Sequence, residues 1–108
     1  MNPTEKEIIV YNEKHYELKY SERTIETIEA VTKRGFMDTI ANSNGLLSLS
    51  SLRQYFVQAL YVVDGGKMSP EHATSVYEAV LREKGFGYVN QLVIVTIQRD
   101  CPFFFLGS

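Results

Sequence analysis

Apolar and polar residues alternate near the start of the chain, and this alternation predicts a β-hairpin over residues 7–20. Tyr16, Leu18 and Tyr20 occupy every second position, which places them on one face of a strand. A β-rich run at residues 8–11 precedes them, and the polar residues between the two runs suit a short turn. Because an isolated hairpin is barely stable in water, we expect its apolar face to pack on helices.

Helical spacing replaces this alternation from Ser21 onward. Ser21 suits the N-cap of a first helix, and Gly35 is expected to end it after a last turn that carries Lys33 and Arg34. The following segment is ambiguous: a short helix is expected over residues 36–40, and the sequence Asn-Ser-Asn-Gly then predicts a break.

The clearest helical stripe begins after Ser50 or Ser51 and is expected to continue to Val63, where Asp64 and two glycines end it. Its apolar members recur at intervals of three and four residues: Leu52, Tyr55, Phe56, Ala59, Leu60 and Val63.

A further helix is predicted from Ser69, a suitable N-cap, and Pro70 at the first helical position, with Gly85 after its end. Its apolar stripe is Ala73, Val76, Tyr77, Val80 and Leu81. Residues 88–99 fit a helix by spacing, and their β-branched centre also fits a buried strand. We favour the helix because about 12 residues continue without a helix breaker.

These elements predict a mainly α fold: a small helical domain of about four to five helices with an N-terminal β-hairpin. The 108 residues, 44% of them apolar, suit one domain (hairpin 7–20, helical body 21–100, apolar tail 101–108) without a structural metal or disulfide. The expected core consists of Ile25, Ile28, Leu52, Phe56, Ala59, Leu60, Val76, Val80, Leu81 and Leu92.

Charge and hydropathy argue against several classes of partner. The net charge of −2 provides no bulk attraction to nucleic acid or to an anionic membrane. No apolar run approaches the ~20 residues that a membrane helix needs, and the start of the chain shows no secretory signal pattern. A single cysteine permits no internal disulfide, so we expect a soluble protein in a reducing cytoplasm.

The residues that usually carry chemistry are few and scattered, so we expect no catalytic site, no metal and no cofactor. His15 and His72 lack an evident acid–base partner, and Cys101 is expected to be an ordinary thiol. Basic pairs at helix ends, such as Lys33 with Arg34 and Arg82 with Lys84, are explained by the helix dipole. The glutamates are expected to form a solvated face: Glu5, Glu7, Glu13, Glu17, Glu22, Glu26 and Glu29.

Aromatic residues are the more suggestive feature, because seven Tyr and six Phe are many for a small core. Three consecutive Phe and a Leu follow Pro102 and cannot all point inward from one short segment, so they should be covered by the fold, another copy or a client. The candidate protein-binding residues are Tyr55, Tyr61, Tyr88, Phe103, Phe104, Phe105 and Leu106.

The order of motifs resembles the tail assembly chaperones of long-tailed bacteriophages and prophages. A hairpin leads into a helix; then come Leu52-Arg53 with Ala59-Leu60, a helix start at Ser69-Pro70-Glu71, and a Gly85-led last helix. The resemblance covers roughly residues 7–99. It implies a non-enzymatic protein that binds the tape measure protein and recruits tail tube subunits. It also implies a location in the host cytoplasm and absence from the mature virion.

Two further expectations remain open at this stage. The alternative class is a small phage or bacterial regulator that inhibits one host protein, and self-association is possible in either class. The resemblance also implies a longer form made by ribosomal slippage. Residues 103–105 require a T-rich run of nine bases at which slippage could occur, whereas simple packing of these side chains would explain the run equally well.

Overall fold

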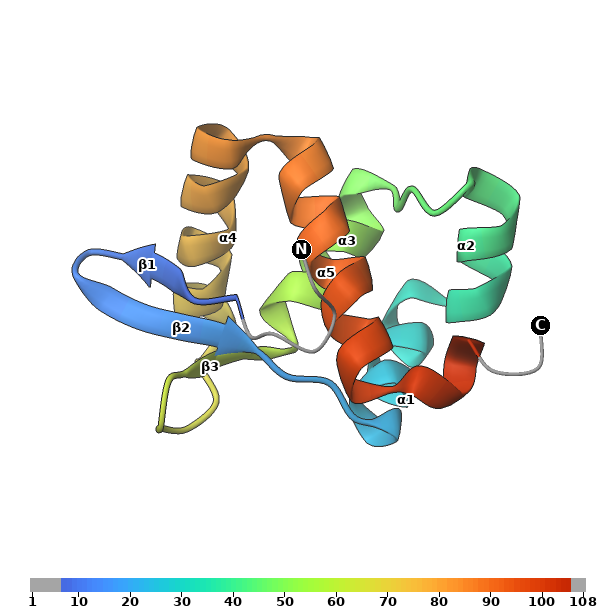
Figure 1. Ribbon diagram of the computed structural model, residues 1–108, viewed down its shortest axis with the longest axis horizontal. Helices are drawn as coiled ribbons and strands as arrows, with labels where there is room; N and C mark the ends of the chain where they lie inside the picture. The colour runs from blue at the N-terminus through green and yellow to red at the C-terminus, as the bar shows by residue number, and fades with distance from the viewer. Residues whose placement is uncertain (1–6, 106–108) are drawn as a thin grey trace.

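The computed structural model describes residues 7–105, which form a helical body flanked by a small antiparallel sheet (Figure 1). Within this range the predicted fold class, a mainly helical domain with an N-terminal hairpin, is confirmed. The elements in chain order are β1 (Ile9–Tyr11), β2 (Lys14–Leu18), α1 (Glu22–Thr32), α2 (Phe36–Ser43), α3 (Leu49–Val57), β3 (Leu60–Val62), α4 (Pro70–Lys84), α5 (Phe86–Asp100) and the 3-10 turn η1 (Pro102–Phe105).

The hairpin β1–β2 turns through two residues, Asn12 and Glu13, whose φ angles are 50° and 66°. Two consecutive positive φ angles are typical of the type I′ turn, whose twist matches that of the paired strands. The register pairs Ile9 with Tyr16. This places the predicted apolar face inward, where the hairpin packs across α4 (Figure 1).

One helix boundary predicted from the sequence is wrong. The stripe expected to continue to Val63 ends at Val57, and Leu60–Val62 form β3 instead. β3 pairs antiparallel with β2, with Leu18 opposite Leu60. The run contains a branched aliphatic and an aromatic residue, which favour a strand once a partner strand is available, so the tertiary pairing overrides the local helical pattern.

The two edges of the sheet differ. The outer edge of β3 is covered by the turn that follows it, because Met68 N–H donates to Leu60 O at 2.9 Å and Val62 N–H donates to Gly66 O at 3.0 Å. β1 is the other edge strand, and Val10 on it is 59% exposed.

Helix caps follow the local signals with small shifts. Ser69 caps α4 with Pro70 at its first position, as predicted. Ser48, rather than Ser50 or Ser51, accepts the N–H of Ser51 at the start of α3. α1 ends two residues earlier than expected, at Thr32, because Lys33 adopts the left-handed conformation (φ 59°) and Gly35 becomes the N-cap of α2.

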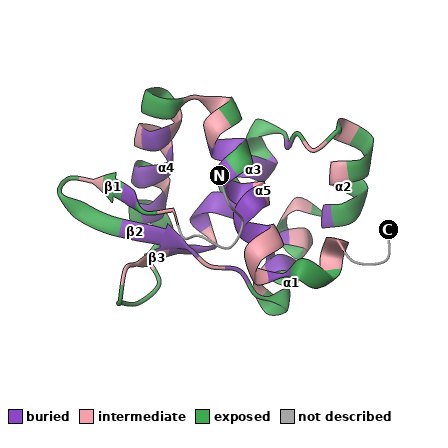
Figure 2. Cartoon of the chain, viewed as in Figure 1, coloured by how far each residue is buried: buried purple, intermediate pink, exposed green. Residues whose placement is uncertain are grey.

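The ambiguous segment at residues 88–99 is helical, as predicted, and lies within α5. α5 is buried on most of its sides (Figure 2), which explains why its sequence also resembles a buried strand. The predicted core is confirmed except at Leu81, which is half-buried. Among the described helices, none is both long enough and apolar enough to cross a membrane.

Candidate protein-binding surface

The groups that could carry chemistry do not converge. Between residues 7 and 105, no three His, Cys, Asp or Glu side chains lie close enough together to hold a metal ion. His15 is exposed on the hairpin. The ring of His72 is also exposed, and its Nε2 lies 3.1 Å from the Tyr16 hydroxyl, a contact that joins α4 to β2.

Cys101 is fully buried at the end of α5. Burial raises the pKa of its thiol, and the nearby carboxylates of Asp100 and Glu22 raise it further. A reactive cysteine needs the opposite environment, because the thiolate is the nucleophile. The environment of Cys101 therefore disfavours nucleophilic chemistry.

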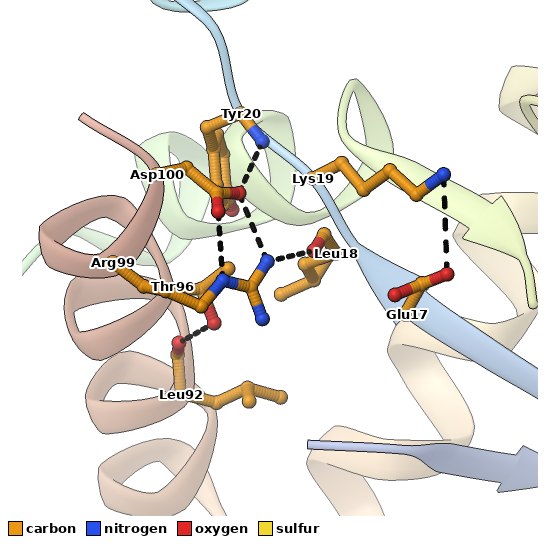
Figure 3. A network of polar contacts seen from close by, with 8 residues as sticks. All are labelled: Glu17, Leu18, Lys19, Tyr20, Leu92, Thr96, Arg99 and Asp100. Carbon is orange, nitrogen blue, oxygen red and sulfur yellow. Dashed lines mark hydrogen bonds and ion pairs between the residues drawn. The ribbon is translucent and has the colours of Figure 1, made fainter. Parts of the chain in front are cut away.

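Arg99, beside this cysteine, belongs to a clamp that fastens the end of α5 to the connection between β2 and α1 (Figure 3). Its Nε donates to Asp100 Oδ1 at 2.7 Å, and its Nη2 donates to Leu18 O at 3.1 Å. The other oxygen of Asp100 accepts the backbone N–H of Tyr20 at 2.8 Å. Because the side chains of Arg99 and Asp100 each form a hydrogen bond with the backbone, this ion pair has a structural role.

The expectation of a solvated glutamate face is wrong for three of its members. Glu29 accepts the backbone N–H of Phe36 at 2.6 Å and so supports the start of α2. Glu7 accepts the Tyr88 hydroxyl at 2.7 Å. Glu17 is 4% exposed, with its Oε2 3.9 Å from Lys19 Nζ. The alternation in β2 placed Glu17 on a polar face with His15, but Glu17 is buried there while His15 stays exposed.

The predicted binding aromatics occupy separate places. Tyr55 is 2% exposed and packs against Phe36, so it is a core residue and offers no binding surface. Tyr61, half-buried on β3, lies beneath Lys19, whose Nζ is 4.9 Å from the ring centre. Tyr88 is half-buried in the first turns of α5.

The aromatic tail is partly covered by the fold itself. Phe104 and Phe105 lie against Phe36 of α2, with ring centres 5.4 and 6.3 Å apart. Phe103 remains 49% exposed, and Leu106 lies outside the described residues. Packing against Phe36 thus accounts for Phe104 and Phe105. The aromatic tail does not form one surface with Tyr61 on β3 or Tyr88 on α5.

Buried tyrosines give this domain an expected alkaline instability. Burial raises the pKa of Tyr20, Tyr55 and Tyr77 above the usual 10.0, and burial together with the bond to Glu7 raises that of Tyr88 to about 12. The folded state therefore favours the neutral phenol. The resulting stability is complete below pH ~10 and is lost as the pH rises through the folded-state values.

Ultraviolet absorbance of tyrosinate, followed with far-ultraviolet circular dichroism, checks this expectation. Ionisation of Tyr20, Tyr55, Tyr77 and Tyr88 should be displaced above pH 10 and should coincide with loss of the helical signal. Titration of these four tyrosines near pH 10 with an unchanged helical signal would contradict the burial of their rings.

A surface not predicted from the sequence is a groove that crosses the start of α3. Three adjoining hollows compose it: Ser50 and Gln54 line both the first and the second, and Arg34 and Ser48 line both the second and the third. The first, of about 590 Å³, lies between α3 and α4. We call these three hollows together, from Arg82 of α4 to the loop between α2 and α3, the α3 groove.

Exposed apolar side chains gather in the α3 groove. Val31, Leu46 and Leu49 line it and are 51, 53 and 59% exposed. They are three of the seven large apolar side chains that the described residues leave exposed. Half-buried Leu81 and the buried ring of Tyr77 line the same groove between α3 and α4. Clustered apolar exposure of this kind is typical of surfaces that bind other molecules.

The loop beside the groove is held by Asn90, a buried polar residue of α5. Its Oδ1 accepts the N–H of Leu47 at 2.9 Å, and its Nδ2 donates to Gly45 O at 2.8 Å. These bonds fasten the segment that carries Leu46 and Ser48. Sequence reasoning assigned Asn90 no role, although a polar side chain between Val89 and Leu92 on a buried face is the signal that could have found it.

No known protein family, curated protein or solved structure matches this chain.

Proposed function

We propose that this chain is a non-enzymatic protein-binding domain that acts as a tail assembly chaperone of a long-tailed bacteriophage or prophage. In this role it binds apolar helical segments of the tape measure protein, keeps them soluble in the bacterial cytoplasm and recruits tail tube subunits. It leaves before the virion is complete. The phage role is based on the order of sequence motifs between residues 7 and 99.

The observation that supports protein binding is the α3 groove. Leu49, Val31 and Leu46 expose apolar surface in its first, second and third hollows respectively. The described histidines and cysteine do not form a reaction site: His72 supports the hairpin, His15 stands alone, and Cys101 is buried. An open apolar groove suits a peptide or helix, which binds by extended contact.

Co-expression with the tape measure protein from the same genome tests the proposal. The chain should shift the tape measure protein from the pellet to the supernatant and co-purify with it, because covering its apolar helices prevents their association. An unrelated domain of similar size is the control. A tape measure protein equally insoluble with and without this chain would contradict the chaperone role.

A further inference from the structure

We infer that the α3 groove binds an amphipathic helix whose polar flanks are acidic. The inference rests on the proposed function only in that the chain binds protein. The client does not have to be the tape measure protein. The occupant is identified by two features of the groove: its charge and its apolar side chains.

Charge is the first feature. The groove is lined by four basic side chains and two acidic ones, a local excess of two positive charges on a chain whose net charge is −2. The basic side chains are Lys33, Arg34, Arg53 and Arg82, and the acidic ones are Asp38 and Glu78. A basic groove on an acidic protein selects an acidic partner, because complementary potentials steer association and reject like charge.

These charges are available to a partner. Arg82 lies 3.7 Å from Glu78 in an ion pair, but its side chain is 81% exposed, and exposed pairs of this kind contribute little. Arg53 extends over the ring of Tyr77, 5.9 Å from its centre. Burial raises the pKa of Tyr77, so the phenol stays neutral beneath the guanidinium and contributes no negative charge to the groove.

The apolar side chains of the groove suit an amphipathic helix. They come from α1, α3 and α4, because the groove crosses the start of α3 rather than following its length. Such a helix presents side chains at positions i, i+3 or i+4 and i+7 to a groove. Leu49, Val31 and half-buried Leu81 provide the matching apolar contacts.

The same features argue against a nucleic acid as occupant. Single-stranded nucleic acid is held by exposed aromatic rings on which bases stack. The one aromatic side chain that lines the three hollows, Tyr77, is 1% exposed. The three large apolar side chains exposed in the hollows, Val31, Leu46 and Leu49, are all aliphatic, and these favour an apolar helix face.

Fluorescence anisotropy with three labelled peptides tests the inference on the full chain. The first is an 18-residue amphipathic helix with a Leu stripe and Glu flanks. The second keeps the stripe and replaces Glu by Lys, and the third keeps the composition of the first in scrambled order. A single-stranded oligonucleotide is the fourth probe. Only the first peptide should bind well, and its affinity should fall several-fold as the salt is raised, because salt screens exposed charges.

Paired variants locate the binding. The double variant Arg53→Glu with Arg82→Glu reverses two positive charges of the groove and should weaken peptide binding by about tenfold or more. The control is Arg23→Glu, which reverses the charge of an exposed residue on α1 outside the groove and should leave binding unchanged. Leu49→Gln should weaken binding by about tenfold. Val10→Thr on the edge strand is its control, because Val10 is as exposed as Leu49, at 59%.

The outcomes separate this inference from the chaperone role. If the acidic helix binds through Leu49 and the arginines but the tape measure protein is not solubilised, the groove inference stands and the chaperone role fails. If the groove variants bind the acidic helix as tightly as the wild type does, the groove inference fails, whether or not the tape measure protein is solubilised. Equal binding of the acidic and basic helices, or of the oligonucleotide, would also overturn it.

Discussion

Replacing Leu60 by alanine is expected to lower the free energy of unfolding by about 2–5 kcal/mol, the range for a truncated core leucine. Leu60 is fully buried, lies opposite Leu18 in the sheet and accepts the N–H of Met68 through its backbone. The truncation leaves a cavity where the sheet meets the helices. Urea denaturation, followed by circular dichroism, measures the effect.

Leu49→Ala is the matched control, since it removes the same atoms from a side chain that is 59% exposed. Its effect should stay within about 0.5 kcal/mol. Equal denaturation midpoints for the two variants would show that Leu60 is not in the core. The total free energy of unfolding of a 108-residue domain is only about 5–15 kcal/mol. The Leu60→Ala variant should therefore also unfold at a visibly lower temperature in a thermal scan.

The second large effect is expected at Asn90. Alanine at this position leaves the N–H of Leu47 and the carbonyl of Gly45 without their side-chain partner. An unsatisfied buried polar group costs about 1–3 kcal/mol, so Asn90→Ala should destabilise the protein by about 2–5 kcal/mol after the small gain in helix propensity. The neighbouring change Gln91→Ala, at an exposed position of the same helix, should be nearly neutral.

Hydrogen exchange distinguishes loosening of the loop from general destabilisation. In Asn90→Ala the amide of Leu47 should exchange faster than the amides in the centre of α5, because the lost bonds belong to the loop. The variant should also bind an acidic helix more weakly, since this loop carries Leu46 and Ser48 of the α3 groove. Unchanged stability and unchanged exchange at Leu47 would show that Asn90 does not hold the loop.

Local signals predicted much of the fold. The alternation of Tyr16 and Leu18, the cap at Ser69-Pro70 and the uninterrupted run of α5 were each interpreted correctly, because they depend on neighbours in sequence. β3 was missed because Leu60 fits both a helical stripe and a strand. The choice depends on pairing with β2, which lies more than 40 residues away in sequence.

The candidate site was harder to predict for a related reason. Val31 has the spacing of a core residue of α1, yet it is exposed, because the apolar stripe that faces the core there is narrower than the sequence pattern. Tyr55 shows the reverse: an aromatic proposed for binding lies in the core. A single sequence shows which residues are apolar, and the packing of α1, α3 and α4 decides which of them stay exposed.

Hydrogen–deuterium exchange on the chain, free and bound to a soluble tape measure fragment, tests the central claim most directly. We expect slower exchange in α3, in the loop before it and in the part of α4 that carries Arg82, with little change in the hairpin. Protection confined to the β1 edge or to η1, or no protection anywhere, would contradict the claim that the α3 groove binds the client.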